Sequence, residues 1–197
     1  MDIRTQSSLL AAIVGLALGV AMLLRAQRPR VLTQYGVFAI SVGGFHLARF
    51  LEGLFPFTED GPLVGRIMLG ITLGTGALLP STALSFFLEF LNFSPRAARY
   101  GRRASLFSVL LGLTVGATPL AEMLWARVAV SVWVLLALSF SVSLVIARMR
   151  TSDSRIDRLR LLYLAVGAAA TLLFSGLDFL GRFDIAFPTL GPIVSTL

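Results

Sequence analysis

The stretch Gly43–Gly53, GGFHLARFLEG, places three ionisable residues inside a long apolar run. His46, Arg49 and Glu52 follow one another at intervals of three, and His46 is the only histidine in the chain. On a helix this spacing puts the three side chains on one oblique stripe. Such a stripe could form an ion pair, relay a proton or hydrogen-bond a polar ligand. Because charge is costly in apolar surroundings, these residues need partners, water or a ligand.

The composition indicates an integral membrane protein. Of the 197 residues, 56% are hydrophobic and only 14% are charged, whereas soluble domains usually carry about 25% charged residues. The chain has no lysine, no cysteine and a single histidine, which excludes a retinal Schiff base, a bis-histidine haem and a histidine-rich metal hydrolase site. Neither a phosphate-binding G-x-x-x-x-G-K-[ST] loop nor an H-E-x-x-H motif occurs. We therefore expect no catalytic residue, no cofactor and no metal.

Apolar runs long enough to cross a bilayer, which takes about 20 residues, recur along the chain. Six of them predict membrane-spanning helices: Ser7–Leu24, Val31–Leu54, Leu63–Leu91, Leu106–Leu120, Val128–Ala147 and Leu161–Leu180. A final segment, residues 189–197, is too short to cross at about 1.5 Å per residue and indicates a seventh helix that is incomplete here. The predicted fold is all-α: a polytopic membrane helix bundle that forms one domain over residues 1–197.

Arginines are distributed unevenly between the two alternating sets of loops. Twelve lie near the loops after the first, third and fifth runs, and four lie in the other set. The positive-inside rule places the twelve in the cytoplasm, so the N-terminus is expected outside the plasma (inner) membrane and the end of a seventh helix inside. These loop arginines also account for the formal charge of +7. The lipid bilayer, and not nucleic acid, is therefore the expected partner.

With this orientation, five groups are expected to share one layer in the outer half of the bundle. They are His46, Arg49, Glu52, Arg66 and Asp178. Three interpretations are open: an ion-pair cluster that holds helices together, an outward-facing pocket for a small ligand or a proton, or lipid-headgroup contact by Arg66. Within the layer we predict that Arg49 pairs with Asp178 and that Glu52 contributes from one turn further out.

Several other residues suggest how the helices pack. Three G-x-x-x-G pairs occur, Gly15/Gly19, Gly70/Gly74 and Gly112/Gly116, and they are expected to bring helices together within the chain. Pro80 lies inside the third run and predicts a helix kink. Glu122 is expected to face water or to pair with Arg127, and Trp133 is expected to pack within the bundle.

Two stretches resemble a known family. Leu78–Phe93, LLPSTALSFFLEFLNF, is similar to the proline-centred third helix in the N-terminal seven-transmembrane-helix sensor region of bacterial histidine kinases. Arg158–Leu197 resembles the sixth helix, the outer loop and the opening of the seventh helix of the same region. Ser85 stands where many relatives are expected to carry histidine. The resemblance implies an output module of PAS, kinase or cyclase type in the cytoplasm, and homodimerisation.

The sequence thus predicts a membrane-embedded sensory input domain in a two-component type of signal transduction. A small-molecule transporter is the main alternative. Transporters often carry matching broken helices in internal repeats, but Pro80 has no proline counterpart in the sixth run. An intramembrane enzyme acting on lipid, with Glu52, Asp178 and His46 as acid and base, is a third interpretation.

Overall fold

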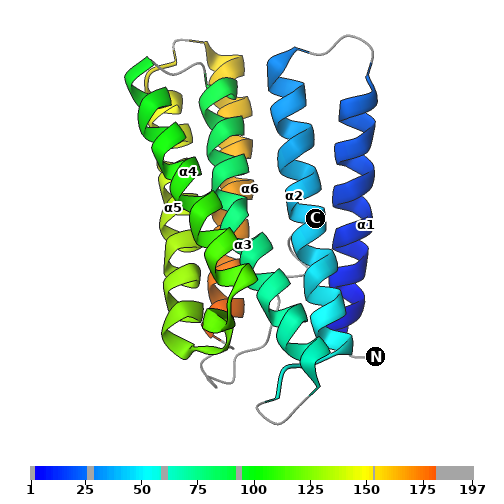
Figure 1. Ribbon diagram of the computed structural model, residues 1–197. Coiled ribbons are helices and arrows are strands. Elements are labelled where there is room, and N and C mark those ends of the chain that lie inside the picture. Colours follow the sequence, from blue (N-terminus) through cyan, green and yellow to red (C-terminus); the bar gives the residue numbers. More distant parts are fainter. Residues whose placement is uncertain (1–2, 26–28, 59–61, 92–94, 153, 181–197) are drawn as a thin grey trace.

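The computed structural model describes residues 3–25, 29–58, 62–91, 95–152 and 154–180, and the side chains of all of these except residues 3–4, 95–98 and 170–180. These residues form six α-helices and one short 3₁₀ helix, with no strand among them (Figure 1). The elements are α1 (Ile3–Leu24), α2 (Arg30–Leu54), α3 (Leu63–Phe90), α4 (Pro95–Ala117), η1 (Pro119–Glu122), α5 (Leu124–Arg150) and α6 (Arg155–Leu180).

Four helices in the described part of the chain are long and apolar enough to cross a membrane. They are α2, α3, α5 and the Thr5–Leu24 portion of α1. The prediction of an all-α bundle with membrane-length helices is confirmed. The finer prediction, six full spans and the start of a seventh, needs correction: six helices are present and four qualify. The predicted seventh helix, residues 189–197, lies outside the described residues.

The limits of α4 explain part of this difference. The helix begins at Pro95, well before the predicted start at Leu106, because proline suits the first helical position and arginine favours helix. It ends at Ala117 and not at Leu120, because Thr118 precedes a proline and is extended (φ −126°, ψ 160°). The arginine-bearing first turns therefore take up much of α4, and its apolar part is short.

The remaining helices follow their apolar runs more closely. α1, α2 and α5 contain the predicted runs completely and extend them by one to a few residues, whereas α3 starts as predicted and ends at Phe90, one residue before the predicted end. α6 begins at Arg155, before the predicted Leu161, and its helical backbone continues to the predicted end at Leu180. Basic residues thus start α6 and end α5, where long arginine side chains can reach polar surroundings.

Helix α3 connects the two parts of the bundle. It packs against α2 on one side and against α4 and α5 on the other, while α1 packs on α2 and α6 on α5. One apolar cluster joins the first half of α3 to the α4–η1–α5 part through Leu69, Leu73, Ala77, Val115, Ala121, Val130 and Val134. A second joins its last half to α5 and α6 through Ala83, Phe86, Phe87, Leu91, Val145, Leu161 and Ala165.

Successive helices run in opposite directions. In Figure 1 the C-terminal ends of α1, α3 and α5 lie at the upper end of the bundle, and the C-terminal ends of α2 and α4 lie at the lower end. The helix ends that carry most of the arginines therefore share the upper end. His46, Arg49 and Glu52 lie on the part of α2 that runs toward the lower end.

Glycines allow the closest helix approaches, and the predicted packing within the chain is confirmed. A Cβ added at Gly43 would lie 2.7 Å from the backbone nitrogen of Leu16, and one added at Gly15 would lie 2.9 Å from Gly43 Cα. Likewise, a Cβ at Gly112 would lie 2.8 Å from the carbonyl oxygen of Gly74. The G-x-x-x-G pairs thus join α1 to α2 and α3 to α4.

Pro80 is almost fully buried within α3, which is a continuous helix from Leu63 to Phe90. A proline supplies no amide hydrogen to the helix ladder. Next to it the hydroxyls of Ser81 and Thr82 donate to the carbonyl oxygens of Leu78 (2.8 Å) and Leu79 (3.1 Å). The predicted kink at Pro80 stays a prediction.

Candidate functional site

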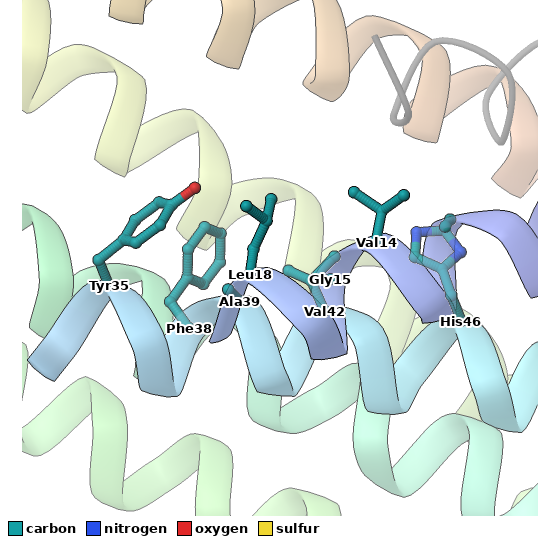
Figure 2. Close-up of a pocket in the computed structure, with 9 residues that line it drawn as sticks. Val14, Gly15, Leu18, Tyr35, Phe38, Ala39, Val42 and His46 are labelled. Carbon is teal, nitrogen blue, oxygen red and sulfur yellow. The ribbon is translucent and has the colours of Figure 1, made fainter. Parts of the chain in front are cut away.

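A cavity of about 170 Å³, open along one side where Val14 and Leu18 are 39% and 43% exposed, lies along α1 and α2 (Figure 2). Its lining residues are Ala11, Val14, Gly15, Leu18, Tyr35, Phe38, Ala39, Val42 and His46. Figure 2 shows Tyr35 and His46 at its opposite ends. These two residues are eleven positions apart on one helix, a rise of about 16 Å. The cavity is therefore elongated, apolar along its length and able to form side-chain hydrogen bonds at its ends.

Small residues create this cavity. Gly15 and Ala39 face each other where α1 and α2 approach closely, since a Cβ at Gly15 would lie 3.1 Å from the carbonyl oxygen of Ala39. Larger side chains, such as Leu18 and Phe38, stand on the same side of the two helices and form the walls. Because no large side chain lies where α1 and α2 approach each other, space remains between these walls.

His46 is the polar residue at one end of the cavity. It is half-buried, and its ring meets the ring of Phe45 edge-on, with centroids 5.4 Å apart and an interplanar angle of 63°. A neutral imidazole offers one hydrogen-bond donor and one acceptor. The arrangement suits an apolar or amphipathic molecule with one hydrogen-bonding group.

Arg49 and Glu52 continue the stripe from His46 toward the lower end of α2, and both are partly buried. The Oε2 atom of Glu52 is buried and has no hydrogen-bond partner among the described residues. A buried polar atom without a partner costs free energy, so this oxygen marks a place where water, a proton or a polar group is expected to bind. Asp178 lies on α6, but its side chain is outside the described set, so the Arg49–Asp178 pair stays a prediction.

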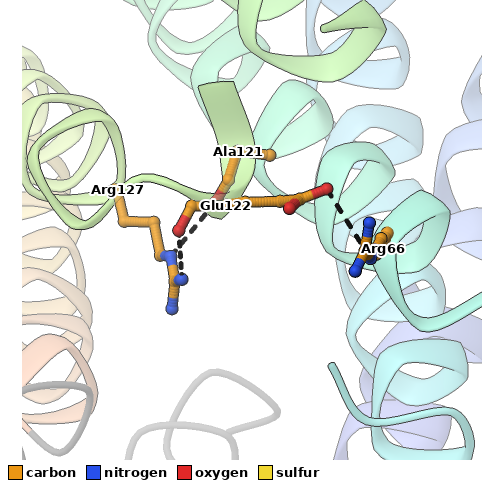
Figure 3. Close-up of polar contacts among 4 residues, drawn as sticks. All are labelled: Arg66, Ala121, Glu122 and Arg127. Carbon is orange, nitrogen blue, oxygen red and sulfur yellow. Dashed lines mark hydrogen bonds and ion pairs between the residues drawn. The ribbon is translucent and has the colours of Figure 1, made fainter. Parts of the chain in front are cut away.

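Arg66 is the fourth residue of the predicted layer whose side chain the structure describes. It pairs with a residue outside that layer. Its Nε atom lies 3.9 Å from Oε1 of Glu122, at the end of η1 (Figure 3). The sequence predicted instead that Glu122 faces water or pairs with Arg127. Both side chains of the Arg66–Glu122 pair are about one-third or more exposed, 41% and 33%, and pairs of this kind contribute little stability.

Arg127 connects three segments at the lower end of the bundle, a role that the sequence did not reveal. Its Nε donates to the carbonyl oxygen of Ala121 (3.1 Å) and its Nη2 donates to the carbonyl oxygen of Glu122 (Figure 3). Its guanidinium carbon lies 5.4 Å from the ring centroid of Phe57, in the segment after α2, within cation–π range. The position of Arg127 in the first turn of α5, a few residues after the proline-containing segment η1, was the available signal.

Acidic and histidine side chains do not gather into a metal site in the described part of the chain, where no group of three or more such residues could hold an ion. Comparison with family models, with curated proteins and with solved structures found no match.

Proposed function

We propose that the chain is a membrane-embedded sensory input region of a signalling protein, of the type that precedes bacterial histidine kinases. In this proposal a stimulus acts within the bundle, at the cavity lined by α1 and α2, and changes the packing of the helices. The change then passes to a cytoplasmic output domain of PAS, kinase or cyclase type in the same polypeptide. The chain itself performs no catalysis.

The cavity lined by α1 and α2 is the observation that carries this proposal. Apolar cavities with a few convergent polar groups are the usual sites for small ligands. A molecule between Tyr35 and His46 would alter the approach of α1 to α2, which is close enough to need glycine at Gly15 and Gly43. Because α2 packs on α3 and α3 packs on α4 and α5, a displaced α2 could transmit the change through the bundle.

The proposed orientation places the upper end of Figure 1 in the cytoplasm and the N-terminus outside the plasma (inner) membrane. It is supported by the arginine-bearing helix ends, which lie together at that end. The apolar parts of α4 and α6 would lie in the bilayer beside the four membrane-length helices, with their basic first turns at the cytoplasmic surface. A further helix after α6 would carry the signal, and two copies of the protein would associate.

The test is to fill the cavity in the full-length protein. Val42→Trp places a large side chain in the cavity, whereas Val37→Trp, on the same helix, replaces an exposed side chain that does not line it. We expect Val42→Trp to change the basal autophosphorylation, or other output activity, at least several-fold. Val37→Trp should leave that activity unchanged. Unchanged output in both variants, with normal melting temperatures, would refute the role of the cavity.

The transporter and the lipid-acting enzyme make different predictions. The reading frame beyond Leu197 should encode a dimerisation helix and a nucleotide-binding domain if the sensory proposal is correct. Purified protein limited to residues 1–197 should neither bind ATP nor autophosphorylate. Solute uptake by proteoliposomes containing this chain, or hydrolysis of added phospholipid, would replace the proposal by one of the alternatives.

A further inference from the structure

The corner between α5 and α6 concentrates positive charge. Residues 148–160 contain five arginines and two aspartates, and Arg148, Arg150, Arg155, Arg158 and Arg160 are all exposed. One contact with an acid is weak: Arg160 Nη1 lies 3.9 Å from Asp157 Oδ1, and both side chains are more than half exposed. Arg158 donates to the carbonyl oxygen of Ser152 (3.0 Å). The corner therefore presents a surplus of guanidinium groups.

An apolar stripe accompanies these arginines on the first turns of α6. Ile156, Leu159 and Tyr163 are 64%, 46% and 76% exposed, whereas Leu161 is buried in the bundle. Successive residues turn by about 100° around a helix. The three exposed side chains therefore lie on the side opposite Leu161 and point away from the bundle.

Arg155 and Arg160 flank this stripe, one on each side by the same helical geometry. The corner includes Arg150, the last residue of the membrane-length helix α5. It therefore lies at the depth where hydrocarbon gives way to lipid headgroups. Arginine binds phosphate through its planar fork of N–H donors, and its stem tolerates apolar surroundings.

We propose that the α5–α6 corner binds the headgroup of an anionic phospholipid. Arg155 and Arg160 hold the phosphate group, while the stripe of Ile156, Leu159 and Tyr163 packs against the upper acyl chains. The stripe distinguishes this partner from a soluble acidic protein or a nucleic acid, which would leave outward-facing apolar side chains in water. The site is separate from the α1–α2 cavity and does not depend on the sensory role.

The test measures lipid binding to the purified full chain in detergent by native mass spectrometry, with phosphatidylglycerol and phosphatidylcholine as probes. Each arginine near an anionic lipid surface contributes roughly fivefold in affinity, so we expect at least about tenfold preference for phosphatidylglycerol. The double variant Arg155→Gln/Arg160→Gln should lose this preference and leaves the Arg158 bond to Ser152 intact. The control variant Arg99→Gln/Arg103→Gln on α4 removes the same amount of charge at the same end of the bundle. It should keep the preference for phosphatidylglycerol.

If both double variants lost the preference for phosphatidylglycerol equally, the attraction would be diffuse and the proposed site would be wrong. If the Arg155→Gln/Arg160→Gln variant kept the preference, the proposed site would be refuted directly. Displacement of the lipid by equimolar glycerol phosphate would assign the arginines to a soluble phosphate and contradict a lipid site. Ile156→Ser/Tyr163→Ser, which keeps every charge, should weaken lipid binding. If this variant bound lipid as well as the unchanged protein does, and the protein also bound RNA, the partner would be a soluble polyanion and not a lipid. Circular dichroism confirms that each variant is helical before comparison.

Discussion

At the scale of single residues, the polar groups toward the lower end of the bundle fall into two sets. The Arg66, Glu122 and Arg127 set has partners and connects segments. The stripe from His46 to Glu52 includes a buried oxygen without a partner among the described residues. The first set is therefore expected to stabilise the fold, and the second is the more sensitive to a bound molecule.

Arg127→Ala should lower the free energy of unfolding by about 2–3 kcal/mol, because it removes two hydrogen bonds from a charged donor. Glu122→Gln breaks a half-exposed ion pair at 3.9 Å but keeps the backbone carbonyl that Arg127 binds, so it should cost less than about 1 kcal/mol. Reversible unfolding in mixed micelles measures both. A larger loss from Glu122→Gln would show that the ion pair, and not Arg127, holds η1 in place.

Trp133 offers a second test at this scale. Its Nε1 donates to Oγ of the fully buried Ser108 (2.9 Å), and its ring meets Phe107 edge-on with centroids 4.6 Å apart. Ser108→Ala leaves the indole N–H without its partner, which should cost about 1–3 kcal/mol.

The matched control for this test is Ser143→Ala, an exposed serine of α5 whose hydroxyl bonds within its own helix. It should change the stability by less than about 0.5 kcal/mol. Trp133 fluorescence, in a Trp125→Phe background, follows the unfolding. Equal stability of the two variants would mean that the ring contact alone positions Trp133.

At the scale of the helices, close backbone approach determines how α1 and α2 pack. Gly43→Ala places a Cβ 2.7 Å from the backbone nitrogen of Leu16, and a backbone atom cannot move aside as a flexible side chain can. We expect α1 and α2 to separate, with a loss of about 1–3 kcal/mol. The melting temperature of the purified protein measures the effect.

The adjacent glycine provides the control. A Cβ added at Gly44 has no neighbour within 4 Å, and alanine favours helix over glycine. Gly44→Ala should therefore leave the melting temperature unchanged or raise it slightly. If Gly43→Ala were equally harmless, the close approach of the two helices would not be needed for stability.

At the scale of the whole molecule, the charge asymmetry predicts the orientation. The chain has no cysteine, so single cysteines can be introduced without removing any. Thr58→Cys, between α2 and α3, should react with an impermeant thiol reagent on intact cells, and Ser152→Cys, between α5 and α6, should not. Both should react after permeabilisation. Reversed labelling would place the arginine-rich end outside and contradict the orientation.

The sequence by itself determined the class of the protein and the approximate extent of α1, α2, α3 and α5. Apolar run length, helix propensity and proline positions are local properties, and helix hydrogen bonds join residues four apart. It also predicted that the glycine pairs join helices within the chain. It misplaced the start of α4 because the arginines of its first turns were assigned to a loop, and the end because Pro119 holds Thr118 extended and stops the helix at Ala117.

Only the tertiary structure decided which residues meet across the bundle. Glu122 lies far from Arg66 in the sequence, yet packing brings them to 3.9 Å, and Arg127 binds backbone carbonyls that no residue type could signal. The cavity likewise needs small residues of α1 opposite α2, with His46 at its end. Such contacts depend on how side chains of separate helices interlock, and a pattern read along one helix contains no information about its neighbour's rotation or height.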